Sequence, residues 1–239
     1  MVDLNAILAI DKDVEETKDV IGGGGYIKES GLYLVKINHA FFEESKGGAT
    51  GVNLSIQHKD KTEMNTTVYI TSGLAKGQKN YYVNQKGNKV LLPGYVTMDE
   101  ICLAASGKPM AQSTLSTKAV EVYDFTAGKK VSKQVQVLDA LIGAIVNLGI
   151  TKNLVNKWKD GAPTAETTDR NEISKAFNKD RQTSKEAAAG EPATFVDKWV
   201  AKHEGVTKDE RTIKDGAVSA HAAAATPAVS ADNTEGLFD

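Results

Sequence analysis

Hydrophobic and polar residues alternate along three early segments of the chain, which is the pattern of half-buried β-strands. Every second residue is apolar in residues 31–37 and 52–56, and residues 65–72 repeat the pattern with Tyr69 on the outward face. Between the first two segments, residues 45–51 read SKGGATG. Glycines adopt the positive φ angles of a tight hairpin without steric cost. The pattern therefore predicts a meander of three antiparallel strands.

A helical spacing follows this meander. Thr97 and Glu100 have the T-x-x-E spacing of a capping box, and Gly107 followed by a proline is a stop signal. Apolar residues lie between them at i, i+3, i+4 and i+7, namely Met98, Ile101, Cys102 and Ala105. We expect one internal helix here, with Cys102 on its packed face as a small hydrophobe.

β-type alternation returns between residues 118 and 177, with turns expected at 126–130 and 159–163. Residues 138–145, LDALIGAI, fit either a strand or one or two turns of helix. Three strands, a helix and then further strands is the order of an OB-type Greek-key barrel. The sequence thus predicts a mainly β fold with minor α content, an enlarged OB-like barrel with one internal helix, short C-terminal helices and a disordered tail.

The two ends of the chain differ from its middle in composition. Residues 1–25 are an acidic leader that ends in GGGG, which lacks the Gly-Lys-Ser/Thr of a phosphate loop and so fits a flexible joint. Residues 26–178 form the expected OB-like nucleic-acid-binding domain, and residues 179–215 a helical extension. Residues 216–239 are rich in alanine, serine and threonine, so we expect a disordered, weakly acidic tail.

Charge is distributed unevenly along the 239 residues, whose formal net charge is −2. Six acids and two lysines give residues 1–20 a net charge of −4, and residues 216–239 carry −3. The intervening residues 21–215 hold 27 basic and 22 acidic side chains, net +5. No acid occurs from Met64 to Met98, a stretch that contains Lys76, Lys79, Lys86 and Lys89. This asymmetry indicates an anionic partner.

Several classes of protein lack support in the sequence. A single cysteine, Cys102, gives no disulfide framework, and no Cys or His cluster has metal-ligand spacing. The first residues lack the basic start of a signal peptide, and no apolar run reaches 18 residues, so we expect a cytoplasmic protein without membrane contact. The four histidines match no catalytic motif. We therefore expect no catalytic residues, no metal and no cofactor.

Single-stranded nucleic acid requires cations for its phosphates and flat side chains on which its bases stack. The expected stacking residues are Tyr69, Tyr81, Tyr82 and Trp158, and the expected phosphate-binding residues are Lys36, Lys76, Lys79, Lys86 and Lys89. Neighbours in an extended chain point in opposite directions. The side chain of one of Tyr81 and Tyr82 could therefore pack inside the barrel while the other faces a base.

The same residues allow a second interpretation. Loop lysines commonly serve solubility alone, so the basic stretch could be an ordinary solvated surface. The protein would then be a structural or adaptor protein whose β-domain binds only protein. A titration that compares single-stranded with double-stranded DNA separates the two interpretations.

Four segments within residues 30–180 read GLYLVKINHAFFEESKGGATGVNLSI, MDEICLAASGKP, LDALIGAIVNLGITKN and TTDRNEISKAF. In these segments the chain resembles bacteriophage-encoded single-stranded DNA-binding proteins. This resemblance implies an OB-type core and a role in phage DNA replication and recombination, within the host cytoplasm. The terminal EGLFD is similar to the acidic, phenylalanine-containing tips that bind replication or recombination proteins, which implies a partner-binding role for Glu235, Leu237, Phe238 and Asp239. This tail departs from the pattern in being alanine-rich and ending in Asp239.

Overall fold

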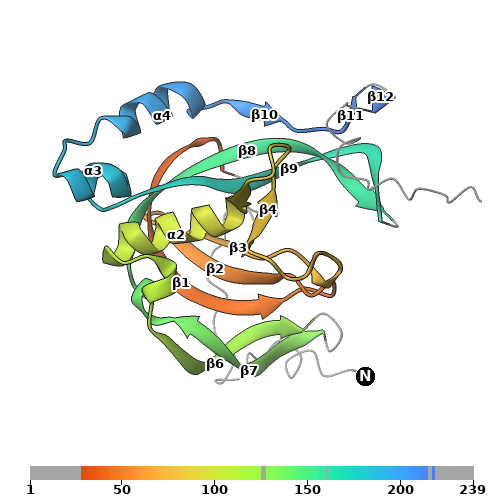
Figure 1. Cartoon of the computed structure of the whole chain (residues 1–239), viewed down its shortest axis with the longest axis horizontal. Helices are drawn as coiled ribbons and strands as arrows, with labels where there is room; N and C mark the ends of the chain where they lie inside the picture. Colours follow the sequence, from red (N-terminus) through yellow and green to blue (C-terminus); the bar gives the residue numbers. More distant parts are fainter. Residues whose placement is uncertain (1–27, 125–127, 160, 215–216, 219–239) are drawn as a thin grey trace, which may run out of the picture.

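The computed structural model describes residues 28–124, 128–159, 161–214 and 217–218 (Figure 1). Strands predominate over helices in this part of the chain, so the mainly β class is confirmed. The elements in chain order are β1 (Gly31–Glu44), β2 (Thr50–His58), β3 (Glu63–Tyr69), η1 (Leu74–Lys76), β4 (Tyr81–Val83), β5 (Lys89–Leu91), α2 (Pro93–Ser106), η2 (Met110–Gln112), β6 (Leu115–Asp124), β7 (Lys129–Leu138), η3 (Asp139–Leu141), β8 (Ile145–Lys159), β9 (Ala162–Phe177), α3 (Ser184–Ala189), α4 (Phe195–His203), β10 (Thr207–Asp209), β11 (Ile213–Lys214) and β12 (Ala217–Val218).

The predicted meander is confirmed. β1, β2 and β3 pair antiparallel in order, and the β1–β2 turn places Gly48 at φ 74°. The alternating apolar residues of the three strands face one core, where Ile37 and Leu54 have no exposed surface. The residue that follows Tyr69, Ile70, is also buried, whereas the Tyr69 side chain is 48% exposed, as the alternation predicted.

The remaining strands extend this sheet around the core. β8 pairs antiparallel with β1 and with β9, and β7 joins β1 at its other end while pairing with β6. In Figure 1, β8 and β9 arch above the core, β1 to β3 run below it, and α2 lies between the two groups. The sheet therefore wraps around a single main core.

A closed barrel is not found. Among the described residues β3 pairs only with β2 and β9 only with β8, so no ladder joins β3 to β9. Helix α2 packs against both of these strands and buries Met98, Ile101 and Cys102 in the core. Side chains from the helix fill the space that a β3–β9 ladder would otherwise close.

The predicted start of this helix was wrong. α2 begins at Pro93, and no side chain caps it. Proline suits the first helical position because its φ is fixed near the helical value and its missing N–H would be unpaired there anyway. Glu100, expected to complete the capping box, instead forms an ion pair with Lys175 on β9. The predicted end is confirmed, since Gly107 follows the helix at φ 71°.

The C-terminal helices pack onto the sheet. The Thr183 and Glu186 capping box of α3 is present, and α4 buries Trp199 against Phe177. The Trp199 ring lies directly on Gly149 of β8, where a Cβ atom would come within 2.6 Å of the ring. The first residues of the expected disordered tail pair as β12 with β11. The leader and the rest of the tail lie outside the described residues.

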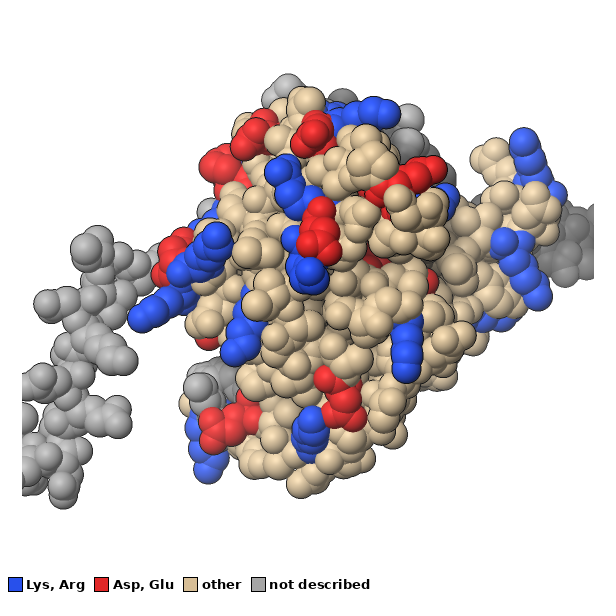
Figure 2. All heavy atoms as spheres, turned by 90° about the vertical axis from the view of Figure 1, so that its left-hand side faces the viewer, with Lys and Arg blue, Asp and Glu red and all other residues tan. Residues whose placement is uncertain are grey.

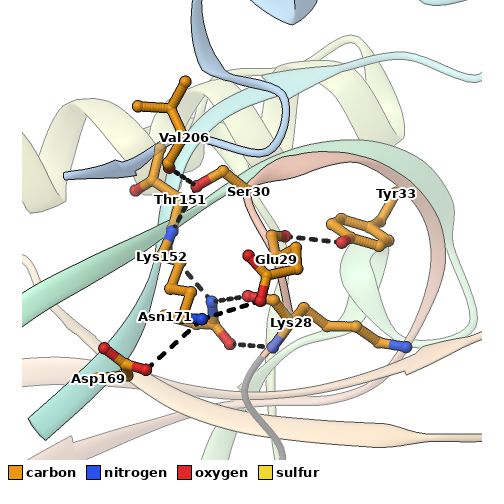
Figure 3. A network of polar contacts seen from close by, with 9 residues as sticks. All are labelled: Lys28, Glu29, Ser30, Tyr33, Thr151, Lys152, Asp169, Asn171 and Val206. Atoms are coloured by element: carbon orange, nitrogen blue, oxygen red, sulfur yellow. Dashed lines mark hydrogen bonds and ion pairs between the residues drawn. The ribbon is translucent and has the colours of Figure 1, made fainter.

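A polar clasp ties the segment before β1 to the middle of the sheet (Figure 3). The side chain of Asn171 accepts from the backbone N–H of Lys28 at 2.7 Å and donates to its carbonyl at 2.8 Å. Ser30 Oγ accepts from Lys152 N at 2.7 Å and donates to the carbonyl of Val206 at 2.5 Å. The chain therefore enters the fold at Lys28 held by buried or part-buried hydrogen bonds. Within the described residues, no helix is long and apolar enough to span a bilayer.

Candidate nucleic-acid interface

Three of the predicted stacking residues lie together. Tyr69, Tyr81 and Tyr82 line one open hollow of about 650 Å³, and Lys76 and Lys79 line it with them. The walls come from the end of β3, the η1 loop, the β4–β5 hairpin and the start of α2. We call it the tyrosine hollow.

Tyr69 reaches the hollow because two glycines leave room around it. Gly51 lies opposite Tyr69 on β2, and a Cβ atom there would come within 3.1 Å of the tyrosine ring. A Cβ atom at Gly94 would lie 2.0 Å from the Tyr69 carbonyl oxygen. The start of α2 can therefore pack against the backbone of β3 only with glycine at this position. Glu43, on the same register line, accepts a hydrogen bond of 2.8 Å from Thr67 and does not line the hollow.

The η1 loop is held by backbone hydrogen bonds to the β1–β2 turn. Leu74 N donates to Gly47 O at 2.9 Å, and the Gln78 side chain donates to Gly48 O at 2.7 Å. Ser72 closes the loop on itself, since its N–H donates to Lys79 O at 2.8 Å and its hydroxyl accepts from Lys79 N at 3.0 Å. Lys76 and Lys79 thus project from a loop whose backbone is fixed.

Tyr81 and Tyr82 belong to a short hairpin that the sequence analysis did not predict. β4 and β5 pair antiparallel, and Asn84 closes the turn by accepting from the backbone N–H groups of Lys86 and Asn88, each at 3.0 Å. The flanking Tyr-Tyr-Val and Lys-Val-Leu triplets and the Asn and Gly between them were the available signal. Neither tyrosine plugs into the core, so that expectation was wrong: Tyr81 is half-buried and Tyr82 is 48% exposed.

The lysines of this region keep their charge uncompensated. Among the described residues, no carboxylate forms an ion pair with Lys36, Lys76, Lys79, Lys86 or Lys89. Figure 2 views the molecule from the left-hand side of Figure 1, and acidic and basic side chains are mixed on this face. The projecting surface at the right-hand edge of Figure 2, which is the side toward the front of Figure 1, shows basic side chains without acidic ones.

Lys36 lies away from the hollow. It is exposed on β1, seven residues before Glu43, which is level with Tyr69 across the sheet. At about 3.3 Å per residue this places Lys36 roughly 23 Å along the strand. Lys36 could contact only a ligand that extends beyond the hollow.

Trp158 lies in a second hollow of about 720 Å³, which shares no lining residue with the first. Its side chain is 70% exposed near the free end of the β8–β9 hairpin. The cations that line this hollow are each paired with an acid, because Lys157 pairs with Glu166 at 3.1 Å and Arg170 pairs with Glu172. Glu210 also lines this hollow. The structure therefore does not bring Trp158 together with the predicted tyrosines.

The shifted pKa values of Cys102 and Glu186 have structural causes. No group of three or more His, Cys, Asp or Glu side chains that could hold a metal ion occurs in the part of the chain that the structure describes. Burial raises the pKa of the Cys102 thiol to about 11, so the sulfur stays protonated and unreactive at neutral pH. The lowered pKa of Glu186, about 2, has a structural cause, since its carboxylate accepts from the backbone N–H groups of Thr183 and Phe195.

No protein-family model matches the chain, and no curated protein matches it. The resemblance to phage single-stranded DNA-binding proteins is therefore supported only by the sequence pattern. The predicted partner-binding residues, Glu235 to Asp239, lie outside the described residues. What the protein binds must be inferred from the geometry of the two hollows and from charge.

Proposed function

We propose that this protein binds single-stranded DNA with little sequence preference and keeps it unpaired and accessible during phage DNA replication and recombination. One observation carries the proposal: a single open hollow is lined by three tyrosines and by two lysines that form no ion pair with any described carboxylate. Bases of any sequence stack on aromatic rings, and ammonium groups bind phosphates. The proposed role requires no catalytic step and no cofactor.

The exposure of the rings favours single strands over duplex. A ring contributes about 1–3 kcal/mol when a base stacks on it, and only an unpaired base presents a free face. Tyr69 and Tyr82 are each 48% exposed, so about half of each side chain is available to a ligand. A duplex would contact the lysines alone, and we therefore expect it to bind more weakly.

The sequence resemblance adds the biological setting. It supports phage replication or recombination as the process and the host cytoplasm as the location. Residues 235–239, an apolar pair between acids, would bind replication or recombination proteins in this proposal.

The test is a fluorescence-anisotropy titration of labelled single-stranded and double-stranded DNA of equal length, repeated at several salt concentrations, with an RNA strand as a third ligand. If about four phosphates are neutralised, log affinity should fall with log salt at a slope of about −3 for single strands. Lys108→Gln is the control for the loss of one positive charge elsewhere on the surface, because Lys108 is exposed but does not line the hollow. Equal affinity for single and double strands, or an affinity that salt does not change, would refute the proposal.

Protein binding through Trp158 is a second candidate function. The observation in its favour is a 70% exposed tryptophan in a hollow where Lys157 and Arg170 are already paired with acids. Exposed tryptophans are common at the centre of protein interfaces, while compensated charge weakens the attraction for phosphates. A chain that bound no DNA but lost a protein partner on Trp158→Ala would support this function instead.

A further inference from the structure

Two ammonium groups lie over the ring of Tyr81. Lys89 Nζ is 4.9 Å and Lys79 Nζ is 5.8 Å from the ring centroid. The hairpin register accounts for Lys89: Tyr81 pairs with Leu91 and Val83 with Lys89, so Lys89 is the diagonal neighbour of Tyr81 on one face of the ribbon. Ammonium groups within about 6 Å of a ring centroid are attracted by the negative face of the ring.

The other two tyrosines of the hollow carry no such cation. Tyr82 pairs with Val90 and therefore points to the opposite face of the hairpin from Tyr81. Within the described residues, no ammonium group lies over the ring of Tyr82 or of Tyr69. Tyr69 rests on Gly51 on one side and is 48% exposed, as is Tyr82. The rings with free surface are thus Tyr69 and Tyr82.

We propose that the tyrosines of the hollow divide two tasks. Tyr81 is a positioning residue that holds Lys79 and Lys89 where two phosphates of the strand pass, whereas Tyr69 and Tyr82 stack on bases. A carboxylate partner would hold the ammonium group but would compensate its positive charge. A lysine side chain with no partner would keep its charge available but would lose conformational entropy when it binds a phosphate. An aromatic ring restricts the lysine without neutralising it, and the three N–H donors remain available to a phosphate.

This inference depends on the proposed function, and its test separates the two tasks by their salt dependence. The slope of log affinity against log salt changes by about 0.7 for each phosphate contact to a single strand, whereas a stacking contact leaves the slope unchanged. Tyr81→Leu should therefore make the slope less steep by about 1.4. Tyr82→Ala should weaken binding about 5- to 150-fold at every salt concentration and leave the slope unchanged.

Three further variants exclude a general structural effect. Tyr81→Phe keeps the ring face and should keep the wild-type slope. The Lys79→Met/Lys89→Met pair should reproduce the slope of Tyr81→Leu, and adding Tyr81→Leu to that pair should change the slope no further. If Tyr81→Leu lowers the urea midpoint of unfolding, the Lys79→Met/Lys89→Met pair tests the phosphate contacts in its place.

A Tyr81→Leu variant with the wild-type slope, or a Tyr81→Phe variant that behaves like Tyr81→Leu, would overturn the inference while leaving DNA binding intact. A wild-type chain that does not bind single strands at all would overturn the proposed function itself. The two failures are therefore distinguishable in one set of titrations.

Discussion

Trp158 and the tyrosine hollow should respond differently to the length of the DNA strand. The two hollows share no lining residue, so we expect a strand of about 4 nucleotides to occupy only one of them and a strand of about 16 nucleotides to reach both. Tyr82→Ala should weaken binding of both lengths. Trp158→Ala should weaken binding of the long strand only.

The size of each effect follows from exposure. The Trp158 and Tyr82 side chains are 70% and 48% exposed, and neither belongs to a hydrophobic core cluster, so truncation removes little packing energy. The loss should therefore fall on binding, at about 1–3 kcal/mol per stacked base, which is about 5- to 150-fold in Kd.

Anisotropy titrations of end-labelled oligonucleotides measure this, with all proteins compared at one salt concentration, because affinity for nucleic acid varies steeply with salt. Unfolding midpoints in urea for each variant provide the control for folding. If Trp158→Ala binds the long strand as tightly as the wild type does, Trp158 does not lie on the DNA path. If Trp158→Ala weakens binding of the short strand as much as Tyr82→Ala does, the two hollows do not act as separate sites.

Three further predictions concern stability. Cys102 should resist alkylation by iodoacetamide in the native state and react fully in urea, since the thiol is buried and its pKa is raised to about 11; rapid native labelling would contradict this. The wild type should lose stability as pH falls from the ordinary carboxyl range near 4.5 toward 2, because folding lowers the pKa of Glu186. The urea midpoint of Glu186→Gln should lack the part of this pH dependence that is due to Glu186. Phe177→Ala should cost about 3–5 kcal/mol of unfolding free energy in urea melts, because the ring is fully buried, while Phe195→Ala, at 42% exposed, should cost less.

The meander could be predicted because its strands are long and buried on one face. Nine residues of β2 contain three inward apolar side chains, which is enough to recognise a period of two. β4 and β5 have three residues each, too few for any period, and so the hairpin that carries Tyr81 and Tyr82 was missed. The start of α2 was misplaced because a capping-box pattern lay four residues beyond a proline that suits the first helical position.

The sequence predicted which residues belong to the candidate site, but not which of them lie together in one hollow. Tyr69 and Tyr82 belong to different elements, β3 and β4, and meet through contacts that no local pattern contains, such as Gly94 against the backbone of Tyr69 and Leu74 against Gly47. For the same reason the separate position of Trp158 could not be foreseen. The lysines over Tyr81 depend on strand register, which becomes known only when the hairpin is known.

The tyrosine hollow is built almost wholly from one uninterrupted stretch of chain, residues 69–94, inserted between β3 and α2. The main core draws on the meander, α2 and β8 instead. Apart from Ile70, which belongs to the main core, and Gly94, which packs against the backbone of β3, changes to this stretch should carry little penalty for folding. Related chains could then vary it while keeping the same scaffold. Transplanting it between such chains should exchange their ligand preferences without redesign of the interior.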